Sequence, residues 1–523
     1  MKKIALLSNV NIDPLKNNLE KNNDLSVYCA GFNQWQPELL NTLSGLYSFN
    51  PDFVFVYLNA NEFAQDTAEL FTAIDFFSAH HTYTQFIIAD FMLQPFSVET
   101  YTSNNNSFSN KMNDDLKMYV SRKPNVHVFE MNRLISYHGY NSLFDDKYWY
   151  LGSIKFSYAG FKTIANEMNY LLNSIQGKTK KVLVLDLDNT IWGGVAAEDG
   201  WENIQIGNQG TGKIYADFQK NILKLKNQGV LLLISSKNNE DDVREVFEKN
   251  KNMLLQWDDF VGHYINWQPK ADNILRMATD LNLGVDSFVF IDDHPVEREH
   301  ARNEIPELTV PEFPKDITQL NRWLITDVVY PFFAKTAITA EDIEKTNQYR
   351  RNAERQNVSQ QLSYDEFIKK LNIRLKIKKV NAESYQRIAQ LTQKTNQFNL
   401  SLKRYSDIEM LNLTKDSDYL TLSCEYEDKF GNEGIIGCAI IKLNGDSAFL
   451  DAYMLSCRVL GRKVEHFFMN FVIEKLKKLN VNELNAVYKP TQRNAMLKTF
   501  LSDYGFTTND ELYYSKKLTK TNR

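Results

Sequence analysis

The sequence contains few cysteines and no long hydrophobic run. Its four cysteines form neither a CxxC pair nor a spacing typical of zinc sites: Cys29, Cys424, Cys438 and Cys457. This cysteine usage is simplest to explain by a reducing cytoplasm. No apolar run approaches the ~18 residues of a membrane-spanning helix, and the run at residues 4–7 is shorter than the ~7–15 residues of a secretion signal. We therefore expect a cytoplasmic protein without membrane insertion.

The sequence also has no excess of charge of one sign. It carries 60 Lys and Arg against 65 Asp and Glu, a formal net charge of −5 in 523 residues. This near-balance gives no general attraction to nucleic acid or to an anionic membrane, so a nucleic-acid partner is not expected. Apolar residues are plentiful, with 43% hydrophobic and 13% aromatic residues. The length predicts about three domains at ~100–200 residues each.

Residues 1–176 are predicted to form the first domain, a parallel α/β sheet. Short apolar runs at 3–10, 52–60 and 85–92 are typical of strands, and residues 68–81 between the last two are typical of a helix. This alternation of strand and helix indicates a parallel sheet. A further helix is predicted at 160–175, before a linker at 176–181.

Residues 181–333 show the strongest strand–helix alternation and are predicted to form a doubly wound parallel sheet. Three strands, at 182–188, 230–236 and 287–293, alternate with helices at 213–229, 240–250 and 271–284. In such sheets, ligands bind at the carboxyl ends of the strands. The polar residues at those three ends are Asp186 and Asp188, Ser235 and Ser236, and Asp292 and Asp293.

The remaining chain is predicted to hold a charged helical linker at 334–371 and a mixed α+β domain at 372–523. Strands are expected at 374–380, 419–427, 434–443, 447–455 and 482–489, with a helix at 463–479 and a last helix after residue 489. The basic tail at 515–523 is expected to be solvated and mobile.

The aspartates at the strand ends predict a metal and a phosphoryl group. Asp186 and Asp188 are two residues apart, so on a strand their side chains point the same way and offer hard oxygens suited to Mg²⁺. A buried carboxylate is costly without such a partner. Lys270 and Ser236 supply a positive charge and a hydroxyl for phosphate oxygens. Asp186 is then a plausible nucleophile, and Asp188 an acid and base.

The segments DLDNT, LLISSKN and FVFIDD, with Lys270 before the last, occur in this order. The ordered set resembles the haloacid dehalogenase (HAD) superfamily of phosphatases and phosphotransferases. The resemblance implies an aspartyl nucleophile and a Mg²⁺ site made by Asp186, Asp188 (through its carbonyl oxygen), Asp292 and Asp293. It implies a phosphate site made by Asn189, Thr190, Ser236 and Lys270, with Ser235 as the alternative to Ser236. Only a small flap, residues 191–207, can act as a cap.

The segments LDLDNTIWGGVAAEDG, SSKNNEDDV, INWQPKADNI and FVFIDDHPVERE resemble the FkbH-like proteins more closely. That resemblance implies an acyl phosphate substrate and transfer of its three-carbon glyceryl unit, as a thioester, to an acyl carrier protein. Glyceryl-transferring members have a DCDNT pattern, whereas this chain has Leu187 in place of the cysteine. Since leucine cannot form a thioester, this departure argues against glyceryl transfer by that route.

The two flanking domains resemble other families. SCRVLGRKVE and NAVYKPTQRNAMLKTFLSDYGF resemble parts of the N-acetyltransferase (GNAT) fold, which implies that coenzyme A or a phosphopantetheine arm binds near Arg458, Gly461, Arg462 and Asn494. A structural glycine turn is the alternative. Residues 1–176 resemble an SGNH-hydrolase-like domain, flavodoxin-like in its sheet, without a complete catalytic triad, and a scaffold or binding role is favoured.

These observations lead to one hypothesis and two alternatives. The hypothesis is a Mg²⁺-dependent FkbH-like enzyme that acts on a phosphorylated biosynthetic intermediate, followed by acyl or glyceryl transfer to a carrier protein or sugar, in secondary-metabolite or surface-polysaccharide biosynthesis. The enzymatic alternative is a plain HAD phosphatase with two recognition domains. The other alternative is a carrier-protein docking module without catalysis.

Overall fold

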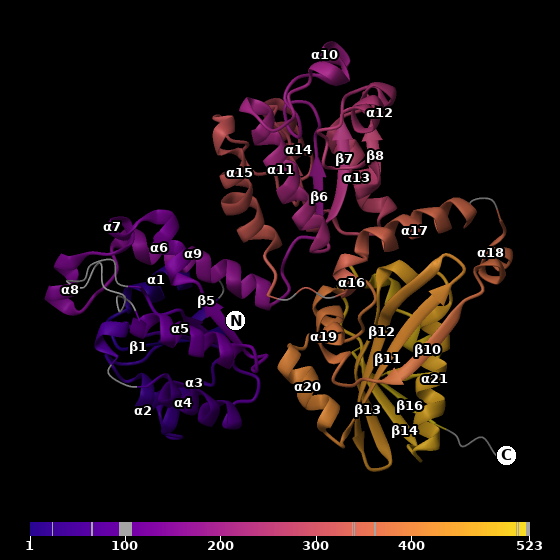
Figure 1. Ribbon diagram of the computed structural model, residues 1–523. Helices are drawn as coiled ribbons and strands as arrows, with labels where there is room; N and C mark the ends of the chain where they lie inside the picture. The colour runs from indigo at the N-terminus through magenta and orange to yellow at the C-terminus, as the bar shows by residue number, and fades with distance from the viewer. Residues whose placement is uncertain are drawn as a thin grey trace. The chain divides into compact units, whose positions relative to one another are not determined.

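The computed structural model (Figure 1) describes residues 1–22, 25–63, 66–93, 107–336, 338, 340–359, 362–508, 510 and 512–518. The chain divides into two units, one of residues 1–173 with 406–409 and one of residues 174–405 with 410–523. The described residues form two parallel sheets and one mainly antiparallel sheet, each covered by helices. The predicted α/β fold class is therefore confirmed, while the predicted domain limits stay predictions.

The first unit is built on a five-stranded parallel sheet of order β2-β1-β3-β4-β5. This is the flavodoxin-like strand order. Because β3 and β4 are continuous apolar runs, both are buried along their whole length, as parallel strands with two covered faces are. The elements are β1 (Lys2–Ser8), α1 (Pro14–Asn22), β2 (Leu25–Cys29), α2 (Trp35–Leu40), α3 (Gly45–Phe49), β3 (Phe53–Tyr57), η1 (Ala60–Glu62), α4 (Thr67–His80), β4 (Gln85–Ala89), α5 (Ser107–Val120), β5 (Val126–Phe129), α6 (Met131–His138), α7 (Tyr140–Leu143), α8 (Asp146–Gly152) and α9 (Tyr158–Ile175).

The second unit begins with a four-stranded parallel sheet of order β8-β7-β6-β9. One sheet face packs on α11 and α12, and the other packs on α13 and α14. Strand β8 was not predicted, because its sequence FVGHYI is short and only partly apolar. The elements are β6 (Val182–Leu185), α10 (Ala196–Asn203), α11 (Gly210–Asn227), β7 (Leu231–Ser236), α12 (Glu240–Lys249), η2 (Trp257–Asp259), β8 (Phe260–Ile265), α13 (Lys270–Asp280), η3 (Val285–Ser287), β9 (Phe288–Ile291), α14 (Pro295–Glu304), η4 (Ile317–Gln319), α15 (Leu320–Trp323) and a π-helical continuation, η5 (Leu324–Phe333).

The same unit ends with a seven-stranded sheet of order β10-β11-β12-β13-β14-β16-β15, in which β13 and β14 are parallel and the other pairs antiparallel. Its apolar faces pack on α21 and α19. The elements are α16 (Ala340–Ile343), α17 (Lys345–Ser359), α18 (Tyr364–Leu371), β10 (Arg374–Lys379), α19 (Tyr385–Lys394), α20 (Asp407–Lys415), β11 (Tyr419–Asp428), β12 (Gly431–Asn444), β13 (Ser447–Leu455), η6 (Cys457–Val459), α21 (Val464–Lys478), β14 (Glu483–Val487), η7 (Ala495–Leu497), α22 (Phe500–Asp503), β15 (Thr507–Thr508) and β16 (Tyr513–Lys517).

The C-terminal segment differs from the prediction. The expected last helix is only the four residues of α22, and two unpredicted strands follow it. Residues 515–517, expected to be mobile, pair with β14, and Leu518 is buried. These short, polar strands are held by pairing with β14 rather than by an apolar pattern of their own. Residues 519–523 of the predicted tail lie outside the described residues.

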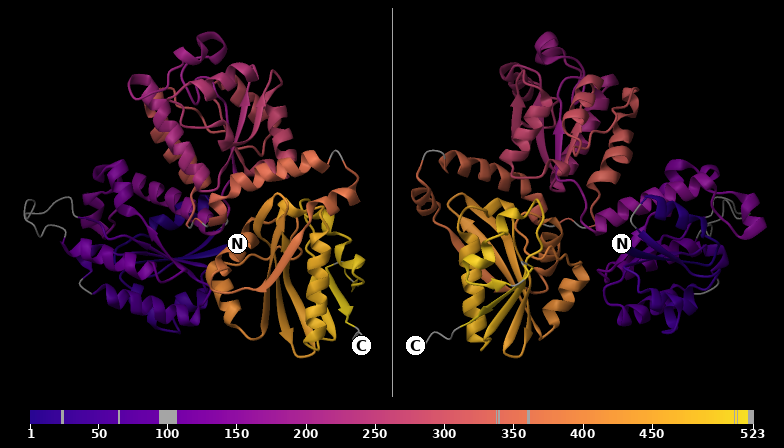
Figure 2. Two further views of the ribbon diagram at one scale, coloured as in Figure 1. Left: turned by 45° about the vertical axis from the view of Figure 1, so that its right-hand side comes forward. Right: turned by 180° about the vertical axis from the view of Figure 1, so that it is seen from behind.

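Helix α17 lies between the two sheets of the second unit, as the views in Figures 1 and 2 show. It packs against β7 and β8. Its Arg355 is 1% exposed and donates to both carboxylate oxygens of Asp428, each at 2.7 Å, and to Glu433 Oε1 at 2.7 Å. Since Asp428 and Glu433 belong to β11 and β12, this buried cluster fixes α17 to the third sheet.

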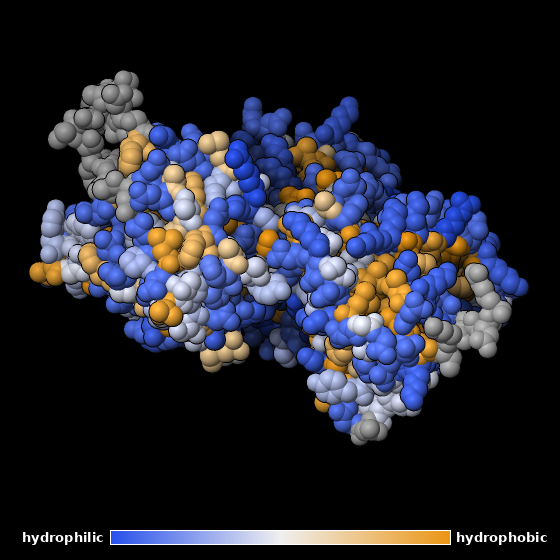
Figure 3. All heavy atoms as spheres, turned by 90° about the horizontal axis from the view of Figure 1, so that it is seen from below, coloured by the Kyte–Doolittle hydropathy of each residue, from blue (hydrophilic) through white to orange (hydrophobic). Residues whose placement is uncertain are grey.

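The surface in Figure 3 is mainly hydrophilic, with hydrophobic side chains gathered in separate patches. Among the described residues, no helix combines the length and apolar character needed to cross a membrane.

Candidate active site

Two neighbouring strands of the second sheet end in aspartates. Strands β6 and β9 are parallel and adjacent, with Leu185 opposite Ile291. Asp186 follows β6, and its backbone N–H donates to Ile291 O at 3.0 Å. Asp292 and Asp293 follow β9 directly. The pairing of the strands therefore brings these three side chains to one edge of the sheet.

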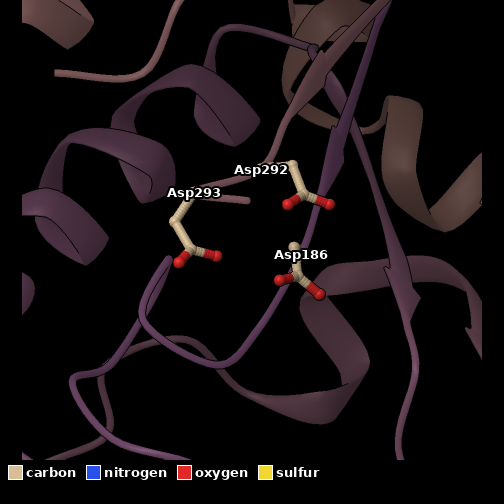
Figure 4. Close-up of side chains that lie close together, drawn as sticks. All are labelled: Asp186, Asp292 and Asp293. Carbon is tan, nitrogen blue, oxygen red and sulfur yellow. The ribbon is translucent and has the colours of Figure 1, made fainter. Parts of the chain in front are cut away.

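The three carboxylates lie close together (Figure 4). Asp186, Asp292 and Asp293 each offer an oxygen, and these oxygens all lie within 4.8 Å of one another. Burial, followed by the negative charge of Asp186, raises the pKa of Asp292 to about 7. A cluster of hard oxygens with this much uncompensated negative charge fits a cation such as Mg²⁺.

Lys270, the first residue of α13, supplies the positive charge within the cluster. Its ammonium lies 2.9 Å from Asp186 Oδ1 and 2.5 Å from Asp292 Oδ2, and the residue is 4% exposed. Burial acts to lower the pKa of Lys270, but the two carboxylates outweigh it and raise the pKa above its ordinary value. Lys270 therefore stays charged, as a group that meets phosphate oxygens should.

Asp188 is held separately from the three clustered carboxylates. Trp192 Nε1 and the Ala196 backbone N–H donate to its Oδ1 at 2.9 and 3.0 Å, and Asn238 Nδ2 donates to its Oδ2 at 2.7 Å. Burial raises the pKa of Asp188, and these hydrogen bonds oppose the rise. A fixed carboxyl with a raised pKa suits an acid/base residue. Its predicted contact with metal runs through the carbonyl oxygen and stays a prediction.

Asn189 and Thr190 shape the turn after β6. Asn189 has a positive φ of 53°, and its side-chain oxygen accepts from Gly194 N at 2.9 Å. Thr190 is fully buried, and its hydroxyl accepts from Asp293 N at 3.2 Å and lies 3.4 Å from Asp293 Oδ1. Thr190 thus orients Asp293. These side chains are engaged within the protein, and their predicted contact with phosphate stays a prediction.

The strand register distinguishes Ser235 from Ser236. Leu185 pairs with Ile234, so the next pair is Asp186 with Ser235, and paired residues of parallel strands point to the same face. Ser235 therefore lies on the face of Asp186 and α13, while Ser236 lies on the other. Ser235 is fully buried, and within the described residues its hydroxyl finds no hydrogen-bond partner. The register thus favours Ser235 over Ser236, the serine expected from the sequence, and which of the two binds phosphate stays a prediction.

Two further residues of this site were not predicted. Asn238 is 2% exposed and holds Asp188, as described above. Arg298 donates through Nη1 to the backbone oxygens of Asp292 and Asp293 at 2.9 and 2.7 Å. Asn238 stands three residues after Ser235 in a motif already noted, so its place after the strand was the available signal. Arg298 acts from α14, and nothing in its local sequence indicates this contact.

The residues predicted to bind coenzyme A lie in the region of the seven-stranded sheet, and their side chains contact other residues of that region or of α17. Arg458 is buried and contacts Ser456, Gln348 and Glu433. Arg462 is buried beside Tyr426 and Asn352. Asn494 is fully buried, donates to Asn399 O and Lys489 O, and accepts from Thr491. Gly461 has a positive φ of 73° with open space around it, as a turn requires. A role of these residues in binding a cofactor stays a prediction.

Comparison with solved structures relates the chain to a phosphatase-domain protein. The match is the crystal structure of the N-terminal part of the protein BF1531 from Bacteroides fragilis, which contains a phosphatase domain and is complexed with Mg. The two sequences are 30% identical, the match covers 64% of this chain and 95% of that chain, and the TM-score is 0.58. At this identity and coverage, the chain belongs to the same family as that protein.

Acetyltransferase structures match the C-terminal part of the chain. The ribosomal-protein-S18-alanine N-acetyltransferase of Escherichia coli matches at 12% identity over 28% of this chain and 97% of that one, with a TM-score of 0.24. The PaiA N-acetyltransferase of Thermoplasma acidophilum, in complex with coenzyme A, matches at 19% identity over 28% and 99%, with a TM-score of 0.23. Likenesses this weak say nothing about activity. No family model and no curated protein matches the chain.

Proposed function

We propose that the second sheet carries a Mg²⁺-dependent phosphatase site of the HAD type, which acts on a phosphorylated biosynthetic intermediate. The observation that carries this proposal is the buried cluster of Asp186, Asp292, Asp293 and Lys270, with Asp188 held beside it. Asp186, Asp292 and Asp293 would hold the Mg²⁺. When bound, the ion offsets the negative charge of the carboxylates and polarises a phosphoryl oxygen.

The proposed reaction has two steps. In the first, a carboxylate oxygen of Asp186 attacks the phosphorus and forms an aspartyl-phosphate, while the bond from phosphorus to the leaving oxygen breaks. Protonated Asp188 gives its proton to that oxygen. In the second step, Asp188 takes a proton from water, which attacks the phosphorus and releases phosphate and the Asp186 carboxylate. Lys270 and the Ser235 hydroxyl would bind phosphate oxygens throughout.

The side chain at position 187 favours hydrolysis over glyceryl transfer at this site. Leu187 is fully buried in the core formed with α11 and α12. The second sheet region has no cysteine, because the four of the chain stand at positions 29, 424, 438 and 457. No protein thioester can therefore form beside Asp186. Acyl delivery by the third sheet region, with coenzyme A or a phosphopantetheine arm, and docking of an acyl carrier protein in a cytoplasmic pathway remain further parts of the proposal.

Phosphate release tests this proposal. We would incubate the protein with Mg²⁺ and a panel of phosphorylated three-carbon acids and sugars, with and without a carrier protein, and repeat each assay with EDTA. We expect metal-dependent release that falls at least ~1,000-fold in Asp186→Asn, since the amide cannot act as the nucleophile. The exposed Asp241 of α12 gives the matched control, Asp241→Asn, which should retain activity. Full activity in Asp186→Asn would refute the nucleophile assignment.

A further inference from the structure

The second unit contains a cavity of about 640 Å³ at the edge of its parallel sheet opposite to the carboxylates. Its wall includes Lys180 and Lys181, directly before β6, and Ser287, directly before β9. The cavity thus lies at the amino ends of the strands whose carboxyl ends carry Asp186 and Asp292. At ~3.3 Å per residue, Lys181 and Asp186 are separated by roughly 16 Å of strand. The cavity is therefore separate from the candidate active site.

The cavity wall carries a large excess of positive charge. Nine lysines and arginines line it, against the two carboxylates of Asp286 and Asp342. The nine lysines and arginines come from the segment before β6, from α17, α19 and η6, and from the loops after α19 and β14. The volume is in the range of ~300–1,000 Å³ that small-molecule sites occupy.

Both carboxylates of the wall are already paired. Asp286 lies 2.9 Å from Arg493, and Asp342 lies 3.0 Å from Lys335 and 3.5 Å from Lys394. Other cations contact neutral atoms that cannot cancel their charge. Lys345 donates to the backbone oxygen of Gly229 at 2.9 Å, and Lys181 donates to that of Lys394 at 3.0 Å. Arg404 donates to Asn396 Oδ1 at 3.0 Å.

Burial and mutual repulsion disfavour the charged forms of two cavity lysines. Burial, together with the neighbouring lysines, lowers the pKa of Lys345 well below its ordinary value. Burial lowers the pKa of Lys394 to about 8, with Asp342 opposing the change and Lys335, Arg387 and Lys181 adding to it. An anion inside the cavity would relieve this repulsion, because it would supply the negative charge that the protein lacks there.

We propose that this cavity binds a small phosphate-bearing anion, a phosphate ester or a diphosphate, through Lys345, Lys394 and Arg404. Several cations around one space call for a multiply charged ligand rather than a single carboxylate. Arginine and lysine together suit phosphate oxygens, since one offers a planar fork of donors and the other a compact charge. Of the residues predicted from the sequence to bind coenzyme A, Arg458 lines this cavity.

Calorimetric titration of the full chain with inorganic pyrophosphate, in EDTA and at constant ionic strength, tests the proposal. EDTA removes metal from the carboxylate cluster, and acetate serves as the singly charged control ligand. We expect pyrophosphate to bind, acetate not to bind, and Lys394→Met to weaken pyrophosphate binding at least tenfold. The matched control is Lys475→Met, an exposed lysine of α21 outside the cavity, which should bind like the unmodified protein. Should Lys394→Met fail to fold, Arg404→Gln gives the same comparison.

Cys457 provides an independent reading of where the anion sits. It is half-buried and lines the cavity, whereas Cys29, also half-buried, belongs to the first unit. Mass spectrometry measures the alkylation of each cysteine. Pyrophosphate should slow the alkylation of Cys457 and leave the alkylation rate of Cys29 unchanged. Tighter binding of coenzyme A than of pyrophosphate would identify a phosphate ester with an organic part, and equal binding would identify a free diphosphate. Three results would overturn the proposal: neither pyrophosphate nor coenzyme A binds, Lys394→Met binds pyrophosphate as tightly as the unmodified protein, or pyrophosphate leaves Cys457 unprotected.

Discussion

The two ends of strand β6 present opposite charge imbalances. At its carboxyl end, the carboxylates of Asp186, Asp292 and Asp293 share a single lysine, Lys270. At its amino end, nine lysines and arginines line a cavity whose wall has two carboxylates, and one of the nine, Arg458, also contacts Glu433. The first imbalance arises within 4.8 Å and suits a metal ion, while the second is spread around a cavity and suits a larger anion. Under the two proposals, an excess of like charge indicates at each end of the strand the kind of ligand that would bind there, a cation at the carboxylates and an anion in the cavity.

Replacement of one lysine at each end of β6 should give the largest difference between the two ends, measured as the free energy of unfolding. Lys270→Met leaves two buried carboxylates without their cation, so without metal we expect a loss of about 3–5 kcal/mol in the free energy of unfolding. Lys394→Met removes a repelled cation, so we expect that variant to be at least as stable as the unmodified protein. Denaturant unfolding in EDTA measures both. Equal losses of stability in the two variants would contradict the opposite charge imbalances inferred for the two ends of β6.

Addition of Mg²⁺ should stabilise the protein through the carboxylate end of β6. The ion binds only the folded cluster, so it should raise the melting temperature of the unmodified protein, by an amount that follows its concentration. Asp292→Asn removes one oxygen charge and should weaken Mg²⁺ binding at least ~10-fold. The control is Asp241→Asn, and a loss of Mg²⁺ binding there would contradict the assignment.

Asn238→Ala tests the support of the proposed acid/base residue. The change removes one of three donors to Asp188, and the remaining carboxylate charge is less stabilised, so the pKa of Asp188 should rise. We expect phosphate release to fall about 10-fold, with the basic limb of the rate profile, on which Asp188 loses the proton that the first step requires, moved to higher pH. Asn239→Ala, at the exposed neighbour, is the matched control. An unshifted basic limb would show that Asn238 only supports the fold.

The smallest expected effect is the pH dependence of anion binding in the cavity. With the pKa of Lys394 lowered to about 8, the side chain is mainly charged at pH 7 and mainly neutral at pH 9. The anion favours the charged form, so affinity should fall up to about tenfold as the pH rises from 7 to 9. Lys394 is surrounded by Asp342, Lys335, Arg387 and Lys181. Lys394→Arg should bind with little change over this range, and the same fall in that variant would assign the dependence to another group.

The carboxylate end of β6 could be predicted from the sequence, whereas its supporting residues could not. Asp186, Asp188, Asp292 and Asp293 stand directly after apolar strands, so the periodic pattern alone placed them at one edge. The choice between Ser235 and Ser236 needed the strand register, which turns neighbouring side chains to opposite faces. Asn238 and Arg298 act from a loop and a helix whose approach depends on tertiary packing.

The cavity at the amino end could not be predicted. Its cations stand far apart in the sequence, as Lys181, Lys345, Lys394 and Arg493 do, and each by itself has the pattern of a solvated surface residue. Only the folded chain brings them together around one space. The pairing of β16 with β14 is a similar case, since its sequence YYSKK has no apolar alternation to indicate a strand.

The buried contact of Arg355 has a practical consequence for dividing this chain into separately expressed pieces. Asp428 and Glu433 lie in the third sheet, but their cation arrives from α17, upstream of it in the sequence. A fragment beginning at β10 would leave the buried Asp428 without its cation, a defect of about 3–5 kcal/mol, while Glu433 would keep Arg458 at 3.6 Å. A fragment beginning before Lys345 would retain the guanidinium. The useful cut for expressing the third sheet therefore falls ahead of α17, on the side of the second sheet.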